Sequence, residues 1–115
     1  MNSKMNITTT ILLVDNEPDS ISVLSMGLED GGFNVDAFND PISALSKFKP
    51  NFYALSILDI NMPKMNGYEL YNELRELDNK VKVSFLTGSE VYVERLRIKD
   101  RAEDFIYNFL KQYKY

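Results

Sequence analysis

The sequence predicts an α/β fold built around a parallel β-sheet. Short apolar segments of strand length alternate with amphipathic segments of helical length, which is the pattern of successive βαβ units. The segment 53–58 (YALSIL) is almost continuously apolar, as expected for a central strand that is covered on both faces. Two of the apolar segments end in an aspartate, so the same pattern predicts an acidic edge to the sheet.

The first half of the chain predicts two strands, each followed by a helix. Residues 11–14 form a strand, and the next helix begins at Pro18, because proline is favoured in a first helical turn. Its apolar residues recur with helical spacing at Ile21, Leu24 and Leu28. Residues 33–38 alternate between apolar and polar, which predicts a half-exposed edge strand. Asp40 and Pro41 then predict the cap and first residue of a short helix. The inner face of that helix carries Ala44, Leu45 and Phe48.

The second half predicts a further strand, helix, strand and helix. The strand at 53–58 leads into Asp59, and the helix at 68–77 follows a loop. That helix carries Leu70, Leu74 and Leu77. Residues 81–86 form the next strand, and residues 89–99 are predicted to be a helix.

The last part of the chain fits two structures. Residues 102–107 (AEDFIY) are one candidate for a fifth strand. However, the apolar residues between 102 and 113 also fall on one helical stripe, and Asp100 and Glu103 have the spacing of a capping box. From the residues alone, a fifth strand and a terminal helix both remain open.

Composition limits the classes of function. The 115 residues predict a single domain over 10–115, after a polar, flexible tail at 1–9. The chain has no histidine and no cysteine, which excludes imidazole and thiolate metal ligands, Ser-His-Asp catalysis and a phosphohistidine carrier. A net charge of −4, with no dense Lys/Arg segment and no long apolar run, argues against binding to nucleic acid or membrane. We therefore expect a cytoplasmic domain.

Asp15 and Asp59 are the candidates for chemistry. Each directly follows an apolar strand, and ligands of open α/β sheets bind outside the carboxyl ends of the strands. Carboxylate oxygens suit Mg²⁺, and a well-placed carboxylate can attack phosphorus when a counter-charge is near. Although an aspartate after a strand is often only a loop or helix cap, the pair predicts a metal and phosphoryl site.

Three motifs resemble the response-regulator receiver family of two-component signalling. In chain order they are ILLVDNEPD from Ile11, LDINMPKMNGYEL from Leu58 and FLTG from Phe85. The resemblance implies a flavodoxin-like, doubly wound parallel sheet with strand order 2-1-3-4-5. The separation of Thr87 from Asn108 matches that between the family's threonine and lysine, which favours a fifth strand over the helix. Because that lysine is missing, we expect the C-terminal part to be truncated or rearranged.

The resemblance also implies a role for each site residue. Asp59 would be the phosphoacceptor, and Thr87 would donate a hydrogen bond to the phosphoryl group. Mg²⁺ would be bound by Asp59 and the carbonyl of Asn61, with Asp15 acting through water. Thr87 and Phe105 would form the conformational switch.

Two positions depart from the family pattern. Asn16 stands where the family most often has a metal-binding aspartate; its amide could offer an oxygen but no charge, so we expect weak Mg²⁺ binding. Asn108 stands in place of the lysine that contacts the phosphoryl group. We therefore expect weaker coupling between phosphorylation and the switch.

The resemblance implies a signalling domain rather than an enzyme. Asp59 would accept a phosphoryl group from a histidine kinase or a phosphotransfer protein, and the signal would pass to an output partner. Exposed apolar residues near Phe109 would also allow a homodimer. The alternative is a phosphorylation-independent pseudo-receiver that acts as an interaction module. An aspartyl-phosphate phosphatase would need a second carboxylate two residues after the nucleophile, where this chain has Asn61.

Overall fold

A computed structural model describes residues 9–86 and 91–93. The strands in these residues are β1 (Thr10–Val14), β2 (Asn34–Phe38), β3 (Leu55–Asp59), β4 (Val83–Leu86) and β5 (Val91–Val93). The helices are α1 (Pro18–Asp30), α2 (Pro41–Lys47) and α3 (Gly67–Leu77). The part of the chain that the structure describes has no helix long and apolar enough to cross a membrane.

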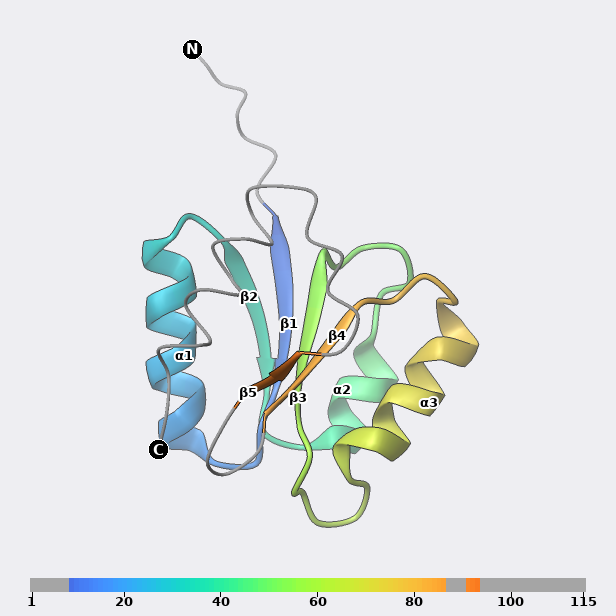
Figure 1. The fold of residues 1–115 in the computed structure, drawn as a ribbon. Helices are drawn as coiled ribbons and strands as arrows, with labels where there is room; N and C mark the ends of the chain where they lie inside the picture. The colour runs from blue at the N-terminus through green and yellow to red at the C-terminus, as the bar shows by residue number, and fades with distance from the viewer. Residues whose placement is uncertain (1–8, 87–90, 94–115) are drawn as a thin grey trace.

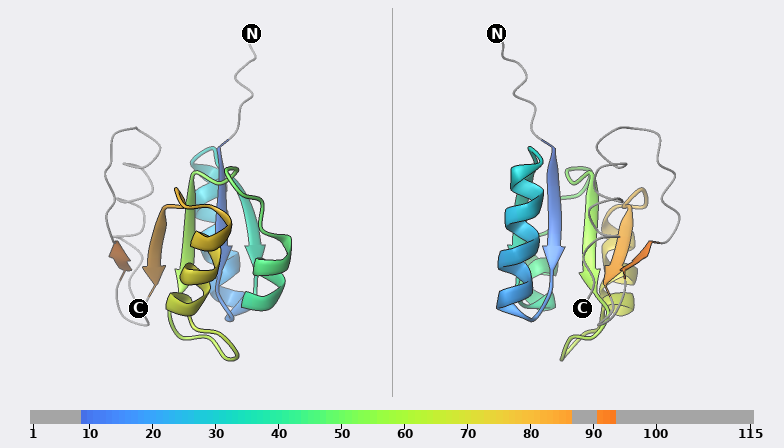
Figure 2. Two further views of the ribbon diagram at one scale, coloured as in Figure 1. Left: turned by 90° about the vertical axis from the view of Figure 1, so that its right-hand side faces the viewer. Right: turned by 60° about the vertical axis from the view of Figure 1, so that its left-hand side comes forward.

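The strands form one sheet in the order β2-β1-β3-β4-β5. The pairs β1–β2, β1–β3 and β3–β4 are parallel, so the predicted parallel sheet and its order 2-1-3-4 are confirmed. Helix α1 covers one face of the sheet, and α2 and α3 cover the other (Figure 1). The two further views in Figure 2 show the same three layers.

Each face of the sheet has its own apolar core, and β1 contributes to both. Its residues Ile11 and Leu13 pack with Leu24 and Leu28 of α1. The opposite face is formed by side chains of β1, β3 and β4 packed against α2 and α3. Its members include Leu12, Val14, Ala44, Leu58, Leu70, Leu74 and Phe85. Because both faces are covered, β1 and β3 carry apolar residues toward both faces instead of alternating strictly with polar ones, although Ser56 is a buried polar residue of β3.

The helix starts follow the local chemistry of the sequence. Pro18 opens α1, and Asp40 caps α2 by accepting a hydrogen bond from the Ser43 backbone N–H at 2.8 Å. Asn66 and Glu69 form a capping box at the start of α3. Sequence reasoning missed this box, although its Asn-x-x-Glu spacing is visible in the sequence and marks the helix start.

The predicted helix over residues 89–99 is wrong at Val91–Val93, which form β5. This strand pairs antiparallel with β4, with Leu86 opposite Val91. The physical reason is that Val-Tyr-Val favours strands, and the outer edge of β4 offers unpaired backbone groups to an adjacent segment. The expected fifth strand or terminal helix near Phe105, and the tail at 1–8, lie outside the described residues.

Candidate functional site

The two aspartates meet at one edge of the sheet. Asp15 directly follows β1, and Asp59 is the last residue of β3. The strands are adjacent and parallel, with Val14 opposite Leu58, so their carboxyl ends lie side by side. This edge is at the bottom of Figure 1, where the loops after β1 and β3 leave the sheet.

Asp15 is held in place by its own loop. Its side chain is buried, with 3% of the residue surface exposed. Its Oδ1 accepts a hydrogen bond from the Glu17 backbone N–H at 2.9 Å. Since a buried carboxylate requires hydrogen bonds or a counter-charge, this contact with the loop that leads into α1 helps to hold Asp15. The Glu17 side chain is exposed and does not cap α1.

Asp59 is half-buried, and its environment opposes its negative charge. Burial is the main reason why its pKa is raised to about 7, and the neighbouring Asp15 carboxyl raises it further. The Asn61 backbone N–H donates to Asp59 Oδ1 at 3.1 Å and acts in the opposite direction. The site therefore has excess negative charge that a cation would relieve.

Asn16 lies between the two loops. Its amide satisfies its hydrogen bonds when the nitrogen Nδ2 faces Asp59 Oδ2 at 3.0 Å and the Asn61 carbonyl oxygen at 3.2 Å. The reverse orientation would place the amide oxygen against these two acceptors, so the hydrogen bonding assigns the nitrogen to this side. The structure thus brings together all four residues expected to hold the metal, since Asp15 also lies beside Asp59.

The loop after β3 is fixed by backbone contacts. Ile60 N–H donates to the Leu86 carbonyl at 2.9 Å, and Gly67 N–H donates to the Ile60 carbonyl at 3.0 Å. Met62 is buried in the core on the α2 and α3 side. The loop that carries Asn61 is therefore tied at both of its ends to the edge of the sheet.

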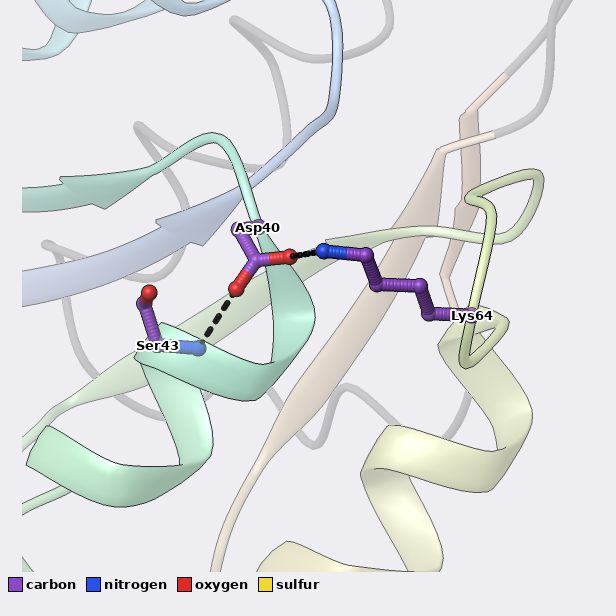
Figure 3. A network of polar contacts seen from close by, with 3 residues as sticks. All are labelled: Asp40, Ser43 and Lys64. Carbon is purple, nitrogen blue, oxygen red and sulfur yellow. Dashed lines mark hydrogen bonds and ion pairs between the residues drawn. The ribbon is translucent and has the colours of Figure 1, made fainter.

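Lys64 is a charged residue near this edge that sequence reasoning did not single out. Its Nζ lies 3.2 Å from Asp40 Oδ1, so it joins the loop after β3 to the N-terminus of α2 (Figure 3). The other oxygen of Asp40 accepts from Ser43 (Figure 3). The pairing joins residues far apart in the sequence, and no local pattern indicates it.

The remaining predicted site residues lie outside the described residues. These are Thr87, Phe105 and Asn108; Thr87 directly follows β4. Among residues 9–86 and 91–93, no three acidic side chains are close enough together to hold a metal ion by themselves. A cation at this edge would therefore need a backbone carbonyl or amide in addition to the carboxylates.

The chain belongs to the response regulator receiver domain family, whose model matches residues 11–112. It is 36% identical over 86 residues to the sensor protein EvgS of Escherichia coli and 38% identical over 86 residues to a CpxR homolog of Haemophilus influenzae, a transcriptional regulatory protein. Each match covers 75% of this chain, but the chain spans only 7% and 37% of the length of these relatives.

Solved receiver structures have the same fold. A crystal structure of the histidine kinase ThkA in complex with the response regulator TrrA matches with a TM-score of 0.65 and 33% identity, over 83% of this chain and 78% of that chain. TrrA from Thermotoga maritima with Mg²⁺ and BeF matches with a TM-score of 0.67 and 28% identity, over 91% and 98% of the two chains. These similarities agree with the strand order and with the doubly wound layers.

Proposed function

We propose that this receiver domain accepts a phosphoryl group on Asp59 in a two-component phosphorelay. The observation that carries the proposal is the position of Asp59 at the carboxyl end of a central strand, beside a second carboxylate from the adjacent strand. Asp59 is half-buried but still accessible, whereas Asp15 is buried. Asp59 is therefore the carboxylate that a phosphodonor can reach.

The reaction needs an ionised, well-placed carboxylate. An Asp59 carboxylate oxygen forms a bond to phosphorus, the bond from phosphorus to the donor nitrogen breaks, and an acyl phosphate results. Asn61 N–H holds one oxygen of Asp59 and so fixes the orientation of the carboxyl group. Position and electrostatic stabilisation are what phosphoryl transfer mainly requires from a protein. We assign the hydrogen bond to the phosphoryl group to Thr87.

The residues of the site fit Mg²⁺. Asp59 Oδ2 and the Asn61 carbonyl oxygen converge on one point, since both lie within hydrogen-bonding distance of the same nitrogen. We propose that these two oxygens bind the ion when the Asn16 amide gives way to it, and that Asp15 acts through water. When bound, Mg²⁺ supplies the counter-charge for the phosphoryl oxygens.

The partners of the chain follow from the same proposal. A histidine kinase or a phosphotransfer protein would supply the phosphoryl group, and the similarity to a response regulator solved with its histidine kinase supports this. An output partner would detect the phosphorylated state through the switch residues Thr87 and Phe105. Self-association through the segment around Phe109 and the cytoplasmic location stay predictions.

Mass spectrometry tests the phosphorylation. The chain is incubated with a small-molecule phosphodonor and MgCl₂, and we expect the mass of one phosphoryl group to be added. The addition should disappear in Asp59→Asn and persist in Asp19→Asn, which removes an exposed carboxylate from the first turn of α1. Label that persists in Asp59→Asn would contradict the assignment.

The pseudo-receiver remains the second candidate because one observation favours it. The Asn16 amide already bridges the two oxygens that Mg²⁺ would use, so this edge is partly satisfied without a cation. In a pseudo-receiver the same fold would bind partners without phosphorylation. No mass addition at any phosphodonor or MgCl₂ concentration, with the fold intact by circular dichroism, would select this function.

A further inference from the structure

We infer that the Asn16 amide nitrogen is a built-in substitute for the divalent cation and occupies the position at which Asp59 and Asn61 would bind Mg²⁺. In this role Asn16 is a hydrogen-bond donor that blocks the ion, and not a weak ligand for it. The inference rests on the proposed function in one point: Asp59 Oδ2 and the Asn61 carbonyl oxygen are the atoms that bind the metal.

The Asn16 amide stands within hydrogen-bonding distance of both oxygens assigned to the metal. With the amide oriented as its hydrogen bonding requires, Nδ2 lies 3.0 Å from Asp59 Oδ2 and 3.2 Å from the Asn61 carbonyl oxygen. One nitrogen with two N–H groups satisfies both acceptors, one from the side chain at the end of β3 and one from the loop that follows. A cation bound to the same two oxygens would have to lie on the same side of them, where the amide now stands.

Asn16 joins the loop after β1 to the end of β3. It follows Asp15 in the loop after β1, and its two acceptors lie at the end of β3 and in the loop beyond. The amide therefore links the two loops that a bound ion would otherwise join. With Asn61 N–H on Oδ1 and Asn16 on Oδ2, both oxygens of Asp59 have a donor from the protein.

Charge favours a neutral side chain at position 16 when no metal is bound. An aspartate at position 16 would place a third carboxylate beside Asp15 and Asp59, and a cation would be needed to offset the repulsion. The neutral amide avoids that repulsion and donates hydrogen bonds instead. The edge is therefore partly stabilised without a metal, and Mg²⁺ must displace two hydrogen bonds to bind.

A blocking role and a ligand role for Asn16 predict opposite effects on Mg²⁺ affinity when the side chain is removed. If Asn16 bound Mg²⁺ through its amide oxygen, removing the side chain in Asn16→Ala would weaken metal binding. If the amide nitrogen blocks the ion, Asn16→Ala should bind Mg²⁺ at least as tightly as the wild type. Asn16→Asp should bind more tightly than either, by roughly tenfold over the wild type, because it adds an anionic ligand.

The first experiment is a titration with MgCl₂, followed by calorimetry and by the melting temperature in circular dichroism. We expect the order of affinity Asn16→Asp, then Asn16→Ala, then wild type, with the shift in melting temperature at saturating MgCl₂ following the same order. Asn39→Asp adds the same charge in the loop after β2 and should bind Mg²⁺ as the wild type does. Weaker binding by Asn16→Ala than by the wild type would overturn the inference.

The second experiment measures the interaction energy between Asn16 and Asp59 in the presence of EDTA. A double-mutant cycle compares Asn16→Ala in the wild-type and in the Asp59→Ala background by urea unfolding. The loss of stability from Asn16→Ala should be clearly smaller when Asp59 is already absent. Equal losses in both backgrounds would show that no such hydrogen bond exists. Neither experiment requires phosphorylation. A chain that takes up no phosphoryl group can still show the expected order of Mg²⁺ affinity, so failure of the proposed function and failure of this inference are distinguishable.

Discussion

Gly67 lies directly against the backbone of Asp59. A Cβ atom at position 67 would be 2.5 Å from the Asp59 carbonyl oxygen and 3.0 Å from the Ile60 Cα. Only a residue without a side chain allows α3 to begin so close to the end of β3. The same glycine donates its N–H to the Ile60 carbonyl, so it closes the loop that carries Asn61.

Gly67→Ala should therefore displace the site as well as destabilise the fold. We expect a loss of about 1–3 kcal/mol in the free energy of unfolding, because backbone atoms must move to admit the methyl group. Urea unfolding gives this value, and the NMR shifts of the Asp59 and Asn61 amides report the displacement. Gly32→Ala is the control for the contact: nothing lies within 4 Å of a Cβ there, but its φ of +96° strains any side chain, so this variant should lose stability without moving the Asp59 amide. If both variants left the Asp59 amide unchanged, the close contact would have no influence on the site.

Asp59→Asn should gain stability relative to the wild type as the pH rises. Burial and the Asp15 charge raise the pKa of Asp59 to about 7 in the folded chain, from an ordinary value of 3.8. An acid whose pKa is raised by folding does not reduce stability when the pH is below its ordinary pKa. It reduces stability by its full amount when the pH is above its folded pKa. Urea unfolding of both proteins in EDTA should show the difference growing between about pH 4 and pH 7. A difference that does not change with pH would contradict the raised pKa.

Asp78→Ala should destabilise the sheet edge opposite the site. Asp78 is buried and accepts hydrogen bonds from the Asn51 N–H at 2.9 Å and the Lys80 N–H at 3.0 Å. Without its carboxylate both donors lose their partner, at a cost of about 2 kcal/mol or more. Chemical denaturation measures this loss, and Asn79→Ala, an exposed neighbour, should change stability by less than about 0.5 kcal/mol. Equal effects of the two variants would refute the role of Asp78.

Asp40→Ala should cost more stability than Lys64→Ala. The hydrogen bond from the Ser43 backbone, followed by the contact with Lys64, lowers the pKa of Asp40. Its contribution is therefore present above the ordinary pKa near 3.8 and is lost as the pH falls through the lower, folded value. Lys64→Ala removes only an exposed ion pair, whereas Asp40→Ala also removes the cap of α2. Thermal melts at pH 7 and at pH 3 test this. The difference in melting temperature between the two variants should be clear at pH 7 and smaller at pH 3.

Phosphorylation should produce a small and local change. Coupling requires the phosphoryl group to favour one conformation over another. If the predicted fifth strand forms, Asn108 stands where the resemblance implies a lysine, and one contact to the phosphoryl group is missing. We expect NMR shifts with beryllofluoride to be confined to the residues around Gly88 and Phe105. Shifts across the whole sheet, from β2 to β4, would contradict this expectation.

The sequence alone determined the four parallel strands and the three helices of residues 9–86, and the position of Asp15 and Asp59 at the strand ends. These features depend on local patterns: continuous apolar strands, helical spacing of leucines, and Pro18 or Asp40 at a helix start. The capping box at Asn66 is also a local feature, since its Asn-x-x-Glu spacing can be read from the sequence. Local patterns suffice here because each element buries its own apolar face against the sheet.

Only the tertiary structure decided how the site residues act on one another. The direction of the Asn16 amide depends on acceptors at the end of another strand, and the raised pKa of Asp59 depends on its burial beside Asp15. In the same way, β5 formed because the edge of β4 was open to an adjacent segment. Hydrogen bonds and charge interactions join atoms that are close in space and distant in the chain, and periodicity along the sequence contains no information about them.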